Sequence, residues 1–152
     1  MPGAETRLTE LGIELPPVSR PVANYLGCKR VGDLLHVGGH GPVTASGVTR
    51  GKVGDAVTLE QAYQAARATA LSMLATVRVE LGSLDRVRQV VKVFGMVNCA
   101  AGFNQTPAVI DGCSDVLVAI FGDAGRHTRS AVGVAELPFD IAVEIEMILQ
   151  VE

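Results

Sequence analysis

Two long segments of the chain repeat their apolar residues at the spacing of an amphipathic helix. The first, residues 55–81, contains a Thr58-x-x-Gln61 capping box near its start and is followed by Gly82, a residue suited to a left-handed C-cap. The second is predicted to run from Thr106, as its N-cap, to the residue before Gly122. Each segment carries one apolar face, which predicts that both helices pack on a sheet.

Other segments alternate apolar and polar residues with the period of a β-strand. The predicted strands are residues 25–29 and 34–37, which form a hairpin turning near Gly32, and residues 87–97, 127–134 and 141–151. Gly38 and Gly39 should end or bulge the second strand, and residues 44–53 should form a loop or a short strand. This order predicts one α/β (α+β) domain over residues 1–152, with a mixed sheet and two helices packed on one face. Residues 3–15 predict a short helix that Pro16 stops, so residues 1–20 are expected to be an N-terminal appendage.

The alternation in the last two strands predicts where charged side chains lie. In the final strand Val143 and Met147 share one face, whereas Glu144 lies on the other. In the preceding strand Val132 and Arg129 take opposite faces. If the valine-rich faces meet the helices, Arg129 and Glu144 share the helix-free face, which is too apolar to be left to water. We therefore expect another subunit to cover that face. We also expect a carboxylate, from the protein or from a ligand, to pair with Arg129.

Composition narrows the class of partner. The chain has 152 residues, 48% of them hydrophobic, and a net charge of -3 with a pI near 5.6, so no basic surface for nucleic acid is expected. Aromatic residues make up only 4% of the chain, which disfavours stacking of single-stranded bases. The three cysteines form no Cys-x-x-Cys pair, and no secretory signal or membrane span is evident. These features predict a cytoplasmic protein with reduced thiols and no membrane partner.

The segment Arg126 to Val151 carries a recognisable motif. It contains Arg129-Ser130, alternating valines, Leu137-Pro138 and Val143-Glu144-Ile145-Glu146. This pattern resembles the C-terminal signature of the reactive-intermediate-deaminase (Rid, YjgF-like) superfamily, whose members are also labelled L-PSP endoribonucleases. The resemblance extends more loosely back to the hairpin and leaves only the N-terminal appendage outside.

The resemblance implies a chorismate-mutase-like fold, a homotrimer and a ligand cleft between neighbouring subunits. In the family's deaminases the residue matching Arg129 binds the carboxylate of a 2-imino acid, and the residue matching Glu144 orients or activates water. The pocket tyrosine matches Tyr25, and a backbone amide that binds the carboxylate matches Gly39. The resemblance implies no metal and no cofactor.

The chain departs from the family pattern at Gly38, at His40 and at Ala131, which replaces a cysteine. His40 follows the pocket glycine, so it is a further candidate for substrate binding. His127 shares the face of Arg129, about 7 Å along the strand, and is another candidate. These departures predict a divergent branch whose substrate is not an ordinary amino-acid imine.

Structural roles remain open for the same residues. Arg129 could form an interface salt bridge with Glu144 or Glu146, and Glu144 could be a buried interface carboxylate without a catalytic role. Tyr25 could be a half-buried packing residue, and His127 an exposed strand residue.

Three functions are therefore considered. The first is hydrolytic deamination of an enamine or imine that bears a carboxylate, with Arg129 as the anchor and Glu144 positioning water. The second is a trimer that binds a small carboxylic acid without catalysis. The third is an endoribonuclease, which the acidic pI disfavours.

Overall fold

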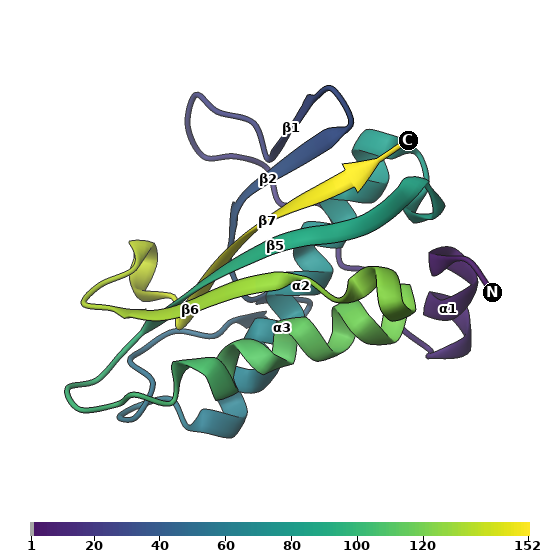
Figure 1. Cartoon of the computed structure of the whole chain (residues 1–152). Coiled ribbons are helices and arrows are strands. Elements are labelled where there is room, and N and C mark those ends of the chain that lie inside the picture. The colour runs from purple at the N-terminus through teal and green to yellow at the C-terminus, as the bar shows by residue number, and fades with distance from the viewer. Residues whose placement is uncertain (1) are drawn as a thin grey trace.

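A five-stranded mixed sheet forms the centre of the protein (Figure 1). The computed structural model describes residues 2–152, and its sheet has the strand order β1-β2-β7-β5-β6. All neighbouring strands are antiparallel except β5 and β6, which confirms the predicted mixed sheet. The strands are β1 (Cys28–Val31), β2 (Leu34–His40), β5 (Val87–Asn98), β6 (Thr128–Val134) and β7 (Val143–Val151).

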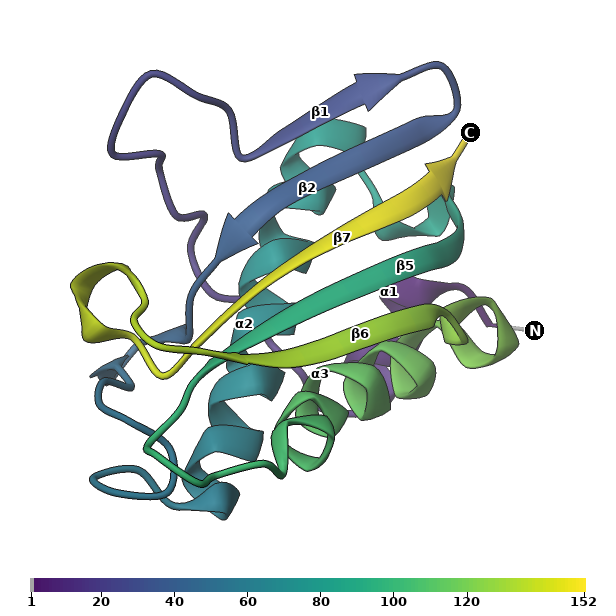
Figure 2. The same ribbon diagram turned by 60° about the vertical axis from the view of Figure 1, so that its left-hand side comes forward.

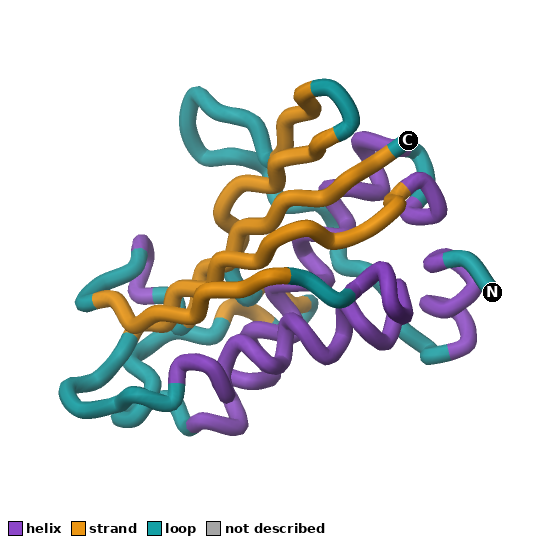
Figure 3. The backbone as a smooth tube through the Cα atoms, in the orientation of Figure 1, coloured by secondary structure: helices purple, strands orange, loops and turns teal. Residues whose placement is uncertain are grey.

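Two long helices, α2 (Leu59–Leu81) and α3 (Thr106–Phe121), cover one face of this sheet (Figures 2 and 3). The capping box of α2 is confirmed, because the Thr58 side chain accepts from the Gln61 amide, and the Gln61 side chain accepts from the Thr58 amide. Gly82 ends α2 with a φ of 82°, as its position predicted. The N-cap prediction for α3 was wrong: Gln105 is the cap, because the Thr106 hydroxyl instead donates to the carbonyl of Ala131 at 3.0 Å.

Small residues allow α3 to approach both its neighbours. A Cβ at Gly112 would lie 2.0 Å from the Tyr63 carbonyl oxygen on α2, and a Cβ at Gly95 on β5 would lie 2.6 Å from Ile110. Any larger residue at either position would therefore force the layers apart. The space between the layers is filled by buried aliphatic side chains, among them Leu74, Leu117, Ile145, Met147 and Leu149.

The N-terminal helix α1 (Ala4–Glu10) is more closely attached than the predicted appendage. Leu8 is buried, and the Glu5 carboxylate forms an ion pair of 2.6 Å with Arg78 on α2. Glu5 also accepts a hydrogen bond from the backbone amide of Leu84. Burial and paired charge together attach α1 to the helical layer.

Short elements connect the main ones. They are β3 (Val43–Thr44), β4 (Gly47–Val48) and the 3-10 helices η1 (Leu84–Arg86), η2 (Gly122–Gly125) and η3 (Pro138–Asp140). The register between β2 and β7 shifts between Val37 and His40, which confirms the bulge expected at the two glycines. Across residues 2–152, every helix is too short or too polar to cross a membrane.

Candidate functional site

Arg129 and Glu144 lie on opposite faces of the sheet, so the prediction that they share the helix-free face was wrong. Across the ladder Arg129 pairs with Val93 and through it with Met147, whose side chains are buried beneath the helices. Glu144 pairs with Met96, three residues further along the uninterrupted part of β5, and hence on the other face.

The physical reason lies in how α3 packs. A Cβ at Gly133 would lie 2.8 Å from the sulfur of Cys99, which follows β5, and 3.6 Å from the side chain of Thr106, the first residue of α3. The small residues of β6 therefore face the helix, while Val132 lies on the open face, where it is 39% exposed. The sequence analysis assumed that the valine-rich face of this strand meets the helices. That assumption selected the wrong face, because the close approach of α3 requires small residues on the helix side.

Arg129 is held by α3 in what we call the Arg129 cluster: Asp111, Ser114, His127 and Arg129. One terminal nitrogen of Arg129 donates to Asp111 at 2.8 Å and to Ser114 at 3.1 Å, and the other donates to the Pro107 carbonyl at 3.3 Å. The arginine side chain is 22% exposed and that of Asp111 49%. A protein carboxylate therefore pairs with this guanidinium, and it belongs to Asp111 rather than to Glu144 or Glu146.

His127 shares a face with Arg129, as the alternation predicted, but that face is the helix side and not the helix-free side. Its Nδ1 lies 2.6 Å from the Gly125 carbonyl oxygen, which can only accept, so Nδ1 carries the proton and Nε2 accepts from the Ser114 hydroxyl at 2.9 Å. Burial, together with the charge of Arg129, lowers the pKa of His127. His127 therefore supports the helix–strand contact and does not line the cavity that contains Glu144.

The Glu144 cavity is lined by the segment 19–27, the end of β2 and the turn 138–141. In Figure 2 the chain before β1 and the connection between β6 and β7 both project at this end of the sheet. Its volume is about 370 Å³, within the range of small-molecule sites. Its charged lining residues are Glu144, Arg20 and Arg50. Its other lining residues, mostly apolar, are Ser19, Pro21, Val22, Tyr25, Gly27, Gly39, His40, Gly41, Val43, Val48, Pro138, Phe139 and Ile141.

Glu144 packs directly against the backbone of the bulge. A Cβ at Gly39 would lie 3.0 Å from the Glu144 carboxyl carbon, so glycine leaves room for this side chain. Burial, and secondly the charge of Glu146, raise the pKa of Glu144 above its ordinary value. A carboxyl group with a raised pKa in a cavity can exchange protons nearer to neutral pH.

The structure brings Tyr25, Gly39 and His40 together with Glu144 around this cavity. Tyr25 is 55% exposed, so its ring stands at the rim. His40 is 7% exposed, and both its nitrogens are occupied: Nδ1 by the Gly38 carbonyl at 2.7 Å and Nε2 by the Thr76 hydroxyl at 2.9 Å. Burial lowers the pKa of His40. His40 thus forms part of the wall but has no nitrogen free for a ligand.

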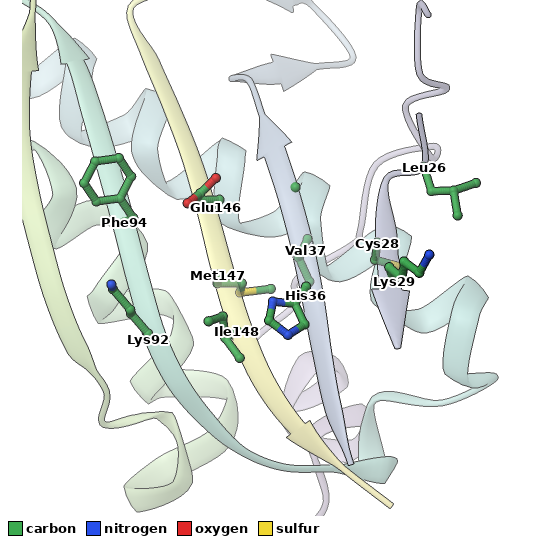
Figure 4. Close-up of a pocket in the computed structure, with 11 residues that line it drawn as sticks. Leu26, Cys28, Lys29, His36, Val37, Lys92, Phe94, Glu146, Met147 and Ile148 are labelled. Atoms are coloured by element: carbon green, nitrogen blue, oxygen red, sulfur yellow. The ribbon is translucent and has the colours of Figure 1, made fainter. Parts of the chain in front are cut away.

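A second hollow of about 310 Å³ lies on the helix-free face of the sheet (Figure 4). Figure 4 shows His36, Lys92, Phe94, Glu146 and Ile148 on β2, β5 and β7, with the helices behind the strands. Apolar and charged side chains alternate here, and no part of residues 2–152 covers them. The hollow is therefore a separate feature from the Glu144 cavity.

Sequence reasoning missed Arg50 and Phe139 in the cavity and Asp111 beside Arg129. Residues 44–53 were expected only to form a loop or a short strand, and nothing in that stretch pointed to a site residue. The connection between the last strands gave no sign that Phe139 and Asp140 have φ values of 58° and 56°. A half-buried guanidinium needs a carboxylate partner, so a partner for Arg129 could have been sought among the acidic residues of the predicted helix that precedes its strand.

A family model and a relative of known sequence both match nearly the whole chain. A family model described as "YjgF/chorismate_mutase-like, putative endoribonuclease" matches residues 5–148. Protein TCP17 of Trypanosoma cruzi is 40% identical over 145 residues, which cover 94% of this chain and 91% of that protein.

Two solved structures share the fold over nearly their whole length. Atu1372 from Agrobacterium tumefaciens, described as of unknown function, is 38% identical with a TM-score of 0.90, covering 98% of this chain and 92% of its own. A "putative endoribonuclease" from Shewanella oneidensis is 29% identical with a TM-score of 0.95, covering 99% and 100%. The chain therefore belongs to the YjgF/chorismate-mutase-like family, as its C-terminal motif predicted.

Proposed function

We propose that this protein hydrolyses the imine or enamine form of a small carboxylic acid in the Glu144 cavity. Membership of the family supports a small-molecule deaminase or endoribonuclease-like role. The observation that carries the choice is Glu144 itself, a carboxyl group of raised pKa that lies against a glycine backbone in a largely apolar cavity. Such a group can take a proton from water and return it to a leaving amine.

The proposed reaction needs one acid–base group and one water molecule. The Glu144 carboxylate accepts a proton as the water oxygen adds to the imine carbon, and this addition breaks the carbon–nitrogen π bond. The proton then passes to the nitrogen, which gives a carbinolamine. As the remaining carbon–nitrogen bond breaks and the carbonyl forms, the new hydroxyl loses its proton, which Glu144 transfers to the leaving nitrogen. Ammonia leaves and a 2-oxo acid is the second product. No other co-reactant is needed for the atoms to balance.

The test is ammonia release from a freshly generated 2-imino acid. Glu144→Gln should lower kcat by about 100-fold or more, because removal of a general acid–base group typically has an effect of that order. Glu146→Gln is the matched control, since Glu146 lies on the same face of the same strand but outside the cavity. Equal rates for Glu144→Gln and Glu146→Gln would contradict the role of Glu144.

Arg129 stays in the proposal as a carboxylate-binding group only if a second copy of the chain supplies it. Within one chain it lies on the other face of the sheet and is engaged by Asp111. Arg129→Gln, assayed for both KM and kcat, tests this role: a raised KM that Asp111→Asn, which loses the same ion pair, does not show would support it.

We also propose that the protein is a homotrimer whose subunits cover the helix-free face. Phe94, Met96 and Ile148 are partly exposed there, and Val132 is 39% exposed. An apolar face of this kind is normally covered. Light scattering in solution should give three times the 15.9 kDa mass of one chain, and a monomer would contradict this.

The same assays separate two other functions. Both nitrogens of His40 are engaged, so His40 cannot serve as a second acid–base group beside Glu144. A cavity with a single such group favours a purely binding protein as the second candidate. Tight binding of a carboxylic acid without ammonia release would support that candidate. Cleavage of single-stranded RNA that Glu144→Gln abolishes would instead support an endoribonuclease.

A further inference from the structure

We propose that Arg50 is the carboxylate anchor of the Glu144 cavity and that Phe139 selects acids with a flat aromatic substituent. This inference rests on the proposed small-acid site and deepens it by naming the groups that recognise the ligand. Arg50 and Phe139 both line the cavity together with Glu144. Arg50 lies outside the segment that carries the family motif, and Phe139 lies within that segment but is not one of the motif residues.

Arg50 is an exposed side chain with one nitrogen engaged by the turn and its terminal donors free. Its backbone forms a bridge with Ile141, and its Nε donates to the Phe139 carbonyl at 3.0 Å. No ion pair or other side-chain hydrogen bond within residues 2–152 engages its two terminal nitrogens. A guanidinium fixed through Nε keeps its terminal donors for a carboxylate, and this geometry favours Arg over Lys.

Two other arginines are weaker candidates for this role. Arg20 also lines the cavity, but within residues 2–152 no hydrogen bond or ion pair fixes its side chain. Arg129 is fixed, but its terminal nitrogens already donate to Asp111, Ser114 and Pro107. A preorganised cation with free donors loses less entropy on binding than a mobile one, and loses no existing pair. Arg50 alone meets both conditions within one chain.

Phe139 is presented to the cavity by a strained turn. Phe139 and Asp140 are consecutive non-glycine residues with φ of 58° and 56°, a conformation that costs free energy at each residue. Hydrogen bonds to the turn offset this cost: the Gly51 amide donates to the Asp140 carbonyl at 2.8 Å, and Asn98 Nδ2 donates to the Asp140 carboxylate at 3.0 Å. The Phe139 ring nevertheless remains 71% exposed.

A large ring left in water on a strained turn points to a ligand contact. The turn is held through its backbone and through Asp140, so the ring of Phe139 is not needed to hold it. Opposite the turn, the 19–27 segment contributes Val22, which is 77% exposed, and Tyr25. Exposed apolar groups on both sides of a cavity fit a flat apolar substituent, while Arg50 fits its carboxylate.

Binding of two stable 2-oxo acids tests this assignment. Calorimetry with phenylglyoxylate and with pyruvate should show tighter binding of the aromatic acid to the unaltered protein. Arg50→Gln should weaken binding of both acids roughly tenfold or more, because a charge-assisted hydrogen bond is lost. The matched control is Arg30→Gln, since Arg30 Nε also donates to a backbone carbonyl, that of Gly32, but outside the cavity. Arg30→Gln should bind both acids as the unaltered protein does.

Phe139→Gly tests the second half of the proposal. Glycine adopts a positive φ without strain, so this variant should fold while losing the ring. Its affinity for phenylglyoxylate should fall to near that for pyruvate. An unchanged preference for the aromatic acid would overturn the selecting role of Phe139.

The outcomes separate this inference from the proposed reaction. Binding that depends on Arg50 without any ammonia release supports the anchor and contradicts deamination. Ammonia release that Arg129→Gln abolishes and Arg50→Gln leaves intact supports deamination and overturns the anchor. If the unaltered protein neither binds these acids nor releases ammonia, both proposals fail.

Discussion

Arg129 and Arg50 occupy contrasting environments, one beneath the sheet against α3 and the other at the rim of the Glu144 cavity. Arg129 has three hydrogen-bond partners from α3, including a carboxylate. Arg50 has a single partner, the Phe139 carbonyl. An arginine whose donors are satisfied by the protein stabilises a contact, whereas one fixed through a single nitrogen keeps donors for a ligand. The number of partners, rather than the residue type, distinguishes the two roles.

The histidines of the two regions add to this contrast. His127 in the Arg129 cluster and His40 in the cavity wall each have both ring nitrogens engaged. In contrast, Glu144 has no hydrogen-bond partner among the side chains of residues 2–152, although burial raises its pKa. Of these three groups, Glu144 is therefore the one whose polar atoms remain available for chemistry.

Among the variants that leave both arginines and Glu144 in place, the largest effect is expected from crowding Glu144. In Gly39→Ala the new Cβ would lie 3.0 Å from the Glu144 carboxyl carbon, so this side chain must shift by a few tenths of an ångström. Deamination should fall roughly tenfold, since misplaced catalytic groups lose rate steeply. In the neighbouring control Gly38→Ala the new Cβ would lie 3.6 Å from the nearest atom, an ordinary contact. Equal rates for both variants would contradict the position assigned to Glu144.

A smaller effect is expected in the Arg129 cluster. Asp111→Asn removes the charge that pairs with Arg129 and should lower the free energy of unfolding by about 1 kcal/mol, the usual scale for a partly exposed pair. Asp123→Asn is the control, because the Arg126–Asp123 pair spans 3.5 Å and is almost fully exposed. Urea unfolding measures both variants.

The ligand affinity of Asp111→Asn sharpens the comparison further. If Arg129 serves only the helix contact, affinity for phenylglyoxylate stays unchanged. A clear rise in affinity would mean that Asp111 competes with the ligand for Arg129, and would favour Arg129 as the anchor.

The smallest effect concerns pH. Burial lowers the pKa of His127 in the folded state, so the unfolded chain binds more protons as pH falls below about 6.5. The stability contributed by neutral His127 is therefore present above that pH and is lost as pH falls towards the lowered pKa. His127→Gln should lose less Tm between pH 7 and pH 5 than the unaltered protein, whereas the exposed His36→Gln should follow it. An identical pH dependence for both variants would contradict the buried, neutral state of His127.

The sequence predicted the elements of this fold better than it predicted their faces. The capping box at Thr58, the left-handed Gly82 and the bulge before His40 are local features, and local residues determine them. The face of Arg129 depends instead on how closely α3 packs on β6, which is a property of the two packed layers and not of the strand's own alternation. Period-two alternation separates the faces of a strand but does not say which face meets a helix.

The cavity shows the same limit. Tyr25, Gly39, His40 and Glu144 were expected in one site, and all four line it. Phe139 could not be expected there, because its left-handed conformation depends on hydrogen bonds from the segment around Arg50, almost ninety residues earlier in the chain. Residues matched by the family resemblance were therefore accessible from the sequence, whereas Phe139, which is held by long-range bonds, was not.

The most direct measurement is a ¹H–¹⁵N NMR titration of the protein with phenylglyoxylate. The account predicts that the amide signals of Gly39, Arg50 and Phe139 shift in proportion to ligand occupancy, while those of Asp111 and Ser114 stay in place. Shifts confined to Asp111, Ser114 and Arg129 would contradict it, because the small acid would then bind against α3 and not beside Glu144.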